Sequence, residues 1–194
     1  MSPLEQVQQA FLQLSWAIKL SSFLQKHLPT NKVDFDHFHS VDDPDDPDGC
    51  ICLPDDQFNS INDIYLGAEN AILRSVGDLF LAFDTALGEA GKKNDPSAQD
   101  SFGQLRILIY MSRCSFAHNV LAPCWEVRGK YRRQIEIKLT DISLQLDLRE
   151  LADKPFDIKQ IGGYLQLFKI KDYIIQILTP NQAMKADGIN AGGN

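Results

Sequence analysis

Residues 134–148 read QIEIKLTDISLQLDL, and this stretch decides the fold class because it interrupts a chain that is otherwise helical in pattern. Apolar and polar side chains alternate on both sides of Thr140-Asp141, as they do on strands with one buried face. We therefore expect a β-hairpin that turns at Thr140-Asp141. A third strand over residues 125–128, joined through Gly129, is left open, so the insert over residues 125–148 is either a hairpin or a three-stranded meander.

Helical spacing dominates on either side of this insert, with apolar residues every three or four positions. We predict long helices over residues 3–28, 59–87, 95–116 and 157–178. Asp95-Pro96 resembles an N-cap followed by proline at the first helical position, and Gly162-Gly163 moves the true start of the last helix to Gly163. The predicted fold class is mainly α: a four-to-five-helix bundle with the β insert before its last helix.

The first predicted helix carries two apolar rows rather than one. The first row contains Leu4, Val7, Phe11, Leu14 and Ile18, and the second contains Leu12, Trp16, Leu20, Leu24 and Leu28. A helix with this much apolar surface needs neighbours on two sides. Those neighbours are either the rest of its own bundle or another subunit.

The chain length of 194 residues and its hydrophobic share of 44% indicate one compact domain, which we place at residues 1–178. Within it, residues 30–58 are expected to form a solvated acidic loop, because Pro44, Pro47 and Pro54 stand among aspartates there. Residues 179–194 are small and polar, and we expect a flexible tail.

The acidic loop also contains residues that could bind a metal. His37, His39, Cys50 and Cys52 are zinc-ligand types, but one-residue spacings make it hard for both thiolates to reach one tetrahedral centre. The aspartates of residues 42–48 fit an EF-hand poorly, because the first position would be Pro44 and the last would be Asp55 rather than glutamate. A solvated charge run explains them better, and we expect no metal and no cofactor.

Charge and hydropathy limit the class of partner. The net charge of −7 argues against a protein that coats nucleic acid, although Arg128, Lys130, Arg132 and Arg133 form a local basic cluster. No apolar run approaches the roughly 20 residues needed to cross a bilayer, so we expect no membrane partner. The first residues lack the pattern of a secretory signal, which indicates a cytoplasmic protein whose four cysteines are free.

Several familiar enzyme motifs are missing, among them the Gly-rich phosphate loop, the Gly-x-Ser-x-Gly elbow and the His-Glu-x-x-His zinc helix. What remains is the hexapeptide RCSFAH, from Arg113 to His118, followed by Asn119. This hexapeptide and the order of long helices resemble the HEPN superfamily (higher eukaryote and prokaryote nucleotide-binding), whose motif is Arg, four to six residues, then His on a helix. The family often has a polar residue after the arginine, where this chain has Cys114.

The resemblance implies metal-independent cleavage of RNA, in which the 2′-hydroxyl attacks the neighbouring phosphate. His118 would act as general acid or base, since imidazole changes charge near neutral pH. Arg113 would hold the phosphate and offset its developing charge. We expect substrate contacts from Asn119, from Arg106 and Tyr110 on the turns before Arg113, and from the basic cluster of Arg128, Lys130, Arg132 and Arg133.

The resemblance also implies a homodimer. Residues five apart on one helix are displaced by about 140°, so a second copy is needed to bring two Arg113/His118 pairs into one cleft. The setting it implies is a toxin-antitoxin or defence system, with RNA as substrate and a neutralising antitoxin protein as partner. The alternatives are a non-catalytic module that binds a nucleotide or a protein, and a purely structural role in which Arg113 pairs with an acid and His118 caps the helix.

Overall fold

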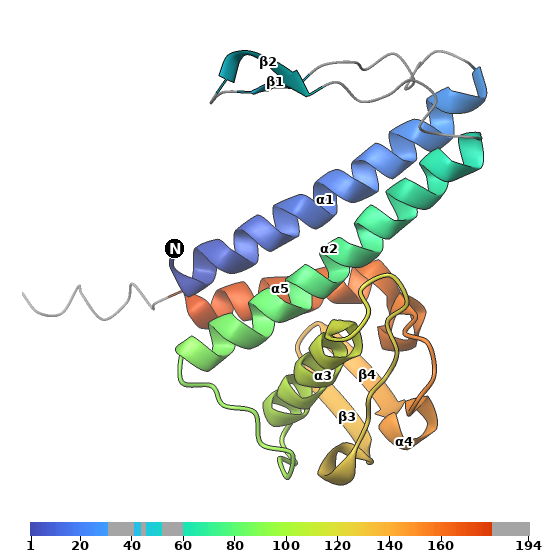
Figure 1. The fold of residues 1–194 in the computed structure, drawn as a ribbon. Helices are drawn as coiled ribbons and strands as arrows, with labels where there is room; N and C mark the ends of the chain where they lie inside the picture. Colours follow the sequence, from blue (N-terminus) through green and yellow to red (C-terminus); the bar gives the residue numbers. More distant parts are fainter. Residues whose placement is uncertain (31–40, 44–45, 52–59, 180–194) are drawn as a thin grey trace, which may run out of the picture. The chain divides into compact units, whose positions relative to one another are not determined.

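The computed structural model of the chain describes residues 1–30, 41–43, 46–51 and 60–179. Over these ranges the protein is mainly helical with a β-hairpin before its last helix, which confirms the predicted fold class (Figure 1). Its contacts form two compact units, unit 1 (Met1–Phe11 with Gly77–Asn194) and unit 2 (Leu12–Val76). Two long helices contribute residues to both units, and one domain over residues 1–178 stays a prediction.

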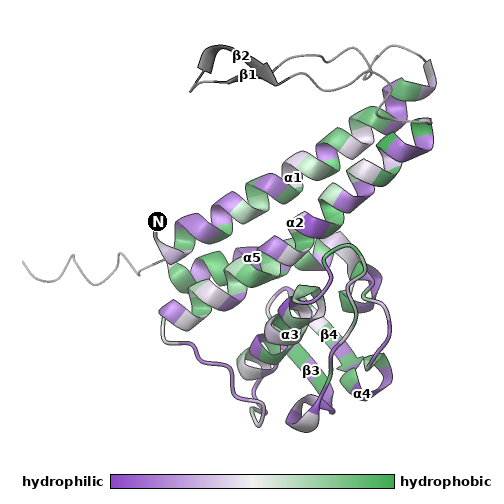
Figure 2. Ribbon diagram, in the orientation of Figure 1, coloured by the Kyte–Doolittle hydropathy of each residue, from purple (hydrophilic) through white to green (hydrophobic). Residues whose placement is uncertain are grey.

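The four predicted long helices and the hairpin before the last of them occur in the predicted order, together with elements that were not predicted. In chain order they are α1 (Pro3–His27), η1 (Leu28–Thr30), β1 (Val41–Asp43), β2 (Asp46–Ile51), α2 (Ile61–Glu89), α3 (Ser101–Phe116), η2 (Gly129–Tyr131), β3 (Gln134–Leu139), β4 (Ile142–Asp147), α4 (Leu148–Leu151), η3 (Ile158–Ile161) and α5 (Gly163–Leu178). α5 begins at Gly163 as predicted, after Gly162 takes the left-handed conformation with φ 90°. Each long helix carries both hydrophobic and hydrophilic bands (Figure 2).

Unit 2 contains a small apolar core and a hairpin that the sequence did not predict. Leu24, Leu28 and Ala68 are buried together. Strands β1 and β2 pair antiparallel, with Asp42 opposite Cys50, so the prediction of a loop throughout residues 30–58 was wrong for these strands. A two-stranded ribbon has only edge strands, and edge strands tolerate proline and aspartate. His37, His39 and Cys52 lie outside the described residues, as does the predicted tail from residue 180 onward.

The two apolar rows of α1 have different surroundings. Val7 and Leu14 of the first row are fully buried, and the second row is buried at its end, at Leu24 and Leu28. Earlier in the second row, however, Leu12 and Trp16 are each 68% exposed. Within the described chain, a neighbour on the second side therefore covers only part of this helix.

Aromatic packing holds unit 1 together around Phe156. The ring centroid of Phe156 lies 5.0 Å from that of Phe116, 5.2 Å from that of Trp125 and 6.2 Å from that of Phe80. These rings come from α2, α3, the segment after α3 and the segment after α4. Because such pairs contribute beyond the area they bury, this cluster fixes the end of α3 against the chain that follows it.

The hairpin has the predicted turn and packs against α3 (Figure 1). Leu139 pairs with Ile142, which leaves Thr140 and Asp141 as the turn. Backbone N–H groups on the free edge of β3 donate hydrogen bonds to side chains of α3. Lys138 N donates to Ser101 Oγ at 3.1 Å, and Glu136 N donates to Gln104 Oε1. An exposed strand edge would leave these donors open to another chain, so α3 serves as the edge cover of the sheet.

One predicted boundary was wrong, and of the two forms left open for the β insert the structure has the two-stranded one. α3 begins at Ser101 rather than at Pro96, because Asp100 is its N-cap and accepts from Gly103 N at 2.9 Å. Asp95 instead bonds Ser97 in a local turn. Residues 125–128 form no third strand; Trp125 N donates to Lys154 O at 2.9 Å, so this segment pairs with the chain after α4 and not with the hairpin.

Gly77 of α2 lies against the side chain of Phe116 at the end of α3. A Cβ on Gly77 would lie 2.7 Å from Phe116 Cδ1. We expect Gly77→Ala to lower the free energy of unfolding by about 1–3 kcal/mol, measured by urea denaturation, because overpacking outweighs the helical preference of alanine. The matched control is Gly67→Ala on the same helix, where nothing lies within 4 Å and stability should stay or rise. Equal effects of the two changes would contradict the prediction.

Candidate functional site

The end of α3 and the chain that returns from it build the candidate site. α3 ends at Phe116 with Ala117 as its C-cap, so Arg113 lies in the last turn and His118 lies beyond the helix. The expectation that Arg113 and His118 lie on one helix was wrong, since the Ala117 N–H already bonds Cys114 O, which closes the last turn. Asn119 then reverses the chain: its Oδ1 accepts from Leu121 N at 3.0 Å and from Ala122 N at 3.1 Å.

Trp125 anchors the returning chain. Its ring is fully buried, and its Nε1 donates to Gln160 Oε1 at 2.7 Å. Its backbone carbonyl accepts from Asp153 N at 2.8 Å, while Cys124 N donates to Ser115 O at 3.1 Å. These bonds fix the next residue, Glu126, beside the last turn of α3.

His118 is exposed and paired. Its Nε2 lies 3.3 Å from Glu126 Oε2, with 76% of the histidine side chain and 42% of the glutamate side chain exposed. Since Nε2 faces the carboxylate, Nδ1 is the nitrogen left for another partner. Arg113 is half-buried, and its side chain makes no hydrogen bond or ion pair with any residue in the described part of the chain. The arginine–carboxylate pair of the structural alternative is therefore not present there.

An open cavity of about 440 Å³ lies beside this pair. The residues that line it and bear on its chemistry are Tyr110, Cys114, Glu126, Arg128, Lys130 and Tyr131. Tyr110, Arg128 and Lys130 belong to the predicted substrate contacts, so the structure brings these three together at one cavity. Arg113 and His118 do not line it, and Glu126 links His118 to its wall.

Both tyrosine hydroxyls at the cavity have a pKa above the ordinary value. The pKa of Tyr110 is raised, chiefly by the charge of the neighbouring Cys114, and the positive charge of Arg113 opposes the rise. Burial raises the pKa of Tyr131, whose hydroxyl accepts a hydrogen bond from Asn94 Nδ2 at 2.8 Å. Both phenols therefore stay neutral at physiological pH and can donate or accept hydrogen bonds.

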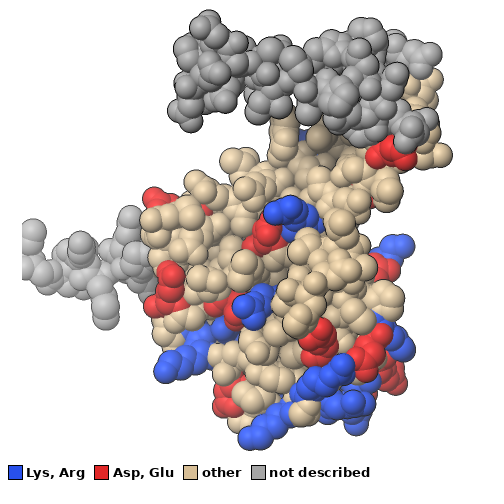
Figure 3. Space-filling view, in the orientation of Figure 1, with Lys and Arg blue, Asp and Glu red and all other residues tan. Residues whose placement is uncertain are grey.

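The four side chains of the predicted basic cluster have different surroundings. Arg128 bonds Asp153 at 2.6 Å and holds the pKa of that carboxyl below its ordinary value. Arg133 binds the loop before α3, through Pro96 O at 3.0 Å and Gln99 Oε1 at 2.9 Å. Lys130 and Arg132 are exposed. Basic and acidic side chains are interspersed over the part of unit 1 that contains β3, η2 and α4 (Figure 3).

Arg106 is the predicted contact that lies deepest. It is 3% exposed, its Nη2 pairs with Asp84 Oδ1 at 3.0 Å, and its Nε donates to Lys92 O at 2.9 Å. Its guanidinium therefore joins α2, α3 and the loop between them rather than lining the open cavity. Asn119 is likewise occupied in its own turn.

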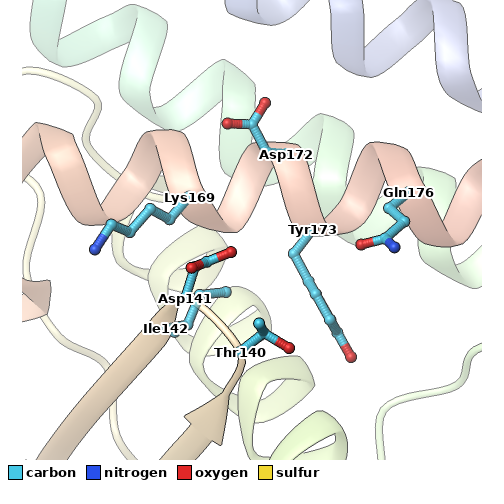
Figure 4. A pocket seen from close by; sticks show the side chains of 7 residues that line it. All are labelled: Thr140, Asp141, Ile142, Lys169, Asp172, Tyr173 and Gln176. Atoms are coloured by element: carbon cyan, nitrogen blue, oxygen red, sulfur yellow. The ribbon is translucent and has the colours of Figure 1, made fainter.

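A second cavity, of about 390 Å³, lies between the hairpin turn and α5. Thr140 and Asp141 face it from the turn, and Lys169, Tyr173 and Gln176 from the helix (Figure 4). Asp172 points away from the turn and pairs with Lys171 at 2.5 Å. None of the predicted site residues lies here, and neither cysteine nor histidine lines this cavity.

In the described ranges, no three His, Cys, Asp or Glu side chains gather as a metal site would require. No helix among the described residues has both the length and the apolar character needed to span a bilayer.

Comparisons with protein-family models, curated proteins and solved structures gave no match, so they show no family for this chain.

Sequence reasoning missed Glu126, Tyr131 and Asp153. Tyr131 could have been found, since an aromatic residue inside the basic cluster of residues 128–133 is typical of a surface that binds nucleic acid. Glu126 gave only a weak signal, its place next to Trp125. No sequence pattern indicates that Asp153 belongs to the site, because its position depends on its own left-handed backbone conformation, with φ 62°.

Proposed function

We propose that the protein is a metal-independent endoribonuclease of the HEPN-like type, in which His118 and Arg113 act on RNA bound at the open cavity. The observation that carries the proposal is the exposed His118–Glu126 pair, whose glutamate lines the same cavity as Arg128 and Lys130. A solvent-accessible imidazole held by a carboxylate, next to cations that can bind phosphates, suits acid–base chemistry on a phosphodiester.

His118 takes the proton in this proposal. Nε2 is engaged with Glu126, so Nδ1 accepts the proton of the ribose 2′-hydroxyl as its oxygen attacks phosphorus. The bond from phosphorus to the 5′-oxygen breaks, and the departing oxygen takes up a proton. The products are a 2′,3′-cyclic phosphate and a 5′-hydroxyl. Glu126 fixes the orientation of the ring, as carboxylates do for catalytic histidines.

Arg113 supplies the charge that the transition state needs. Its guanidinium is not bound to a carboxylate in the described chain, so it is available to donate two hydrogen bonds to a phosphate. Negative charge accumulates on the phosphate oxygens during the attack, and a fixed cation stabilises it most at that point.

A second copy would provide the acid for the leaving oxygen, so we propose a homodimer. Most of α3 is buried within one chain, which leaves Tyr110, Arg113 and Cys114 as the strip available to a partner near the motif. The exposed Leu12 and Trp16 of α1 support association with another chain as well. A cytoplasmic toxin-antitoxin or defence role, with an antitoxin protein as partner, is the setting we propose from the resemblance.

The test is incubation of the purified protein with 5′-labelled RNA in EDTA. We expect fragments that end in a 2′,3′-cyclic phosphate, identified by their resistance to phosphatase until acid opens the ring. Absence of cleavage in both EDTA and Mg²⁺, or cleavage in Mg²⁺ alone, would reject the proposed mechanism.

The second candidate is a non-catalytic module that binds a nucleotide at the same cavity. It is favoured by the fact that the cavity is lined by Tyr110, Cys114 and Tyr131, and not by Arg113 or His118. Binding of nucleotide without any cleavage of RNA would favour this candidate.

A further inference from the structure

An aromatic pair forms one wall of the open cavity. Tyr110 comes from α3 and Tyr131 from η2, and their rings are stacked with centroids 5.2 Å apart and planes inclined by 27°. The hydrogen bond from Asn94 holds the Tyr131 hydroxyl in place, and the ring is only partly buried. A fixed tyrosine that is exposed to a cavity is a surface on which a nucleobase can stack.

The backbone of η2 places a cation next to this wall. Gly129 begins η2 with φ 54°, a left-handed conformation that favours glycine, and Lys130 and Tyr131 follow it directly. Lys130 is exposed and forms no ion pair with another described residue. Arg128 lines the same cavity, although its guanidinium is shared with Asp153. Stacking surface and positive charge are thus within one cavity, as binding of a base and its phosphate requires.

The cavity limits what can enter. Its volume of about 440 Å³ is in the range of pockets that hold one small ligand. A base inside a duplex has both faces covered by its neighbours, so only an unpaired base can place a face against Tyr131. The wall therefore distinguishes single-stranded from double-stranded RNA more than it distinguishes one base from another, since every base has a face that can stack.

We propose that Tyr131, with Tyr110 behind it and Lys130 beside it, is a subsite that binds one unpaired nucleotide of RNA. The base stacks on Tyr131 and the phosphate is bound by Lys130. The inference rests on the proposed function for its choice of RNA as ligand, and it assigns Tyr131 as the residue that determines specificity.

The test measures binding without cleavage. A His118→Ala protein is titrated into labelled single-stranded RNA and into a blunt RNA duplex of the same sequence, and fluorescence anisotropy gives Kd at two salt concentrations. We expect at least about 10-fold tighter binding of the single strand, which Tyr131→Ala should lose and Tyr131→Phe should largely keep, since stacking is worth about 1–3 kcal/mol per base. Lys130→Ala should weaken binding and flatten its salt dependence.

The matched control is Tyr173→Ala, the same change at the second cavity, which should bind like its parent. Equal binding of duplex and single strand, or equal effects of Tyr131→Ala and Tyr173→Ala, would overturn the subsite. Thermal unfolding confirms that each variant is folded. If Tyr131→Ala unfolds, the preference of the parent protein for single-stranded RNA and the weaker binding of Lys130→Ala still decide the proposal. Wild-type protein that binds single strands but never cleaves them would reject the nuclease alone; cleavage with no effect of Tyr131 would reject the subsite alone.

Discussion

Cleavage of RNA by a His118→Ala variant should be slower than by the wild-type protein by a factor of about 10²–10⁴, the usual contribution of a positioned acid or base. The 2′-hydroxyl loses its proton acceptor, and in a dimer the leaving oxygen loses its proton donor as well. Initial rates on labelled RNA in EDTA, with substrate above its KM, measure the effect. Because 76% of the His118 side chain is exposed, the change should alter the free energy of unfolding by no more than about 0.5 kcal/mol.

The matched control for this prediction is His27→Ala in α1, the same chemical change outside the candidate site. It should cleave RNA at the wild-type rate. Equal rates for His118→Ala and wild type would mean that any cleavage observed comes from another residue or from a contaminant.

Replacing Asp84 by alanine should lower the free energy of unfolding by about 3 kcal/mol, toward the lower end of the range for breaking a buried pair. Arg106 is 3% exposed and would keep its charge without a carboxylate, while its Nη1 already lacks a partner in the described chain. Asp84 itself is 20% exposed, so water can reach the vacated position and moderate the loss. Urea denaturation at neutral pH measures the change.

Asp78→Ala on the same helix is the matched control, because Asp78 is exposed, and its effect should be within about 0.5 kcal/mol. Adding Arg106→Met to Asp84→Ala should restore part of the lost stability, since an apolar side chain carries no desolvation penalty. A loss below about 1 kcal/mol for Asp84→Ala would contradict the view that this ion pair joins α2 to α3.

The sequence predicted the regular elements because their signals are local. The long helices follow from three- and four-residue spacing, and the turn at Thr140-Asp141 follows from alternation on both sides of it. The start of α3 depended on distant contacts: Asp95 and Asp100 are both suitable N-caps, and the chain before α3 is held by Arg133, 37 residues after Pro96. The absent third strand has the same cause, since the partners of Trp125 lie after α4.

The candidate site was predicted in its residue types more than in its arrangement. RCSFAH identified the end of α3, and the basic cluster identified Arg128 and Lys130 at the cavity. No local pattern shows that Arg106 is buried against Asp84, or that Glu126 reaches His118. The sequence does not distinguish charged side chains that become buried from those that stay exposed to solvent, because burial depends on how the whole chain packs.

Because the partners of Trp125 follow it in the chain, the cavity can assemble only late during synthesis of the protein. Its partners, Asp153, Lys154 and Gln160, leave the ribosome some thirty residues after Trp125 itself. Until then the segment that presents Glu126 and Arg128 lacks the bonds of Trp125, and the contacts left to hold it near α3 include the bond from Cys124 N to Ser115 O and the stacking of Tyr131 on Tyr110. A nascent chain, or one truncated before Gln160, therefore lacks the anchored wall of the cavity, and any activity that depends on this wall begins only after Gln160 has been made.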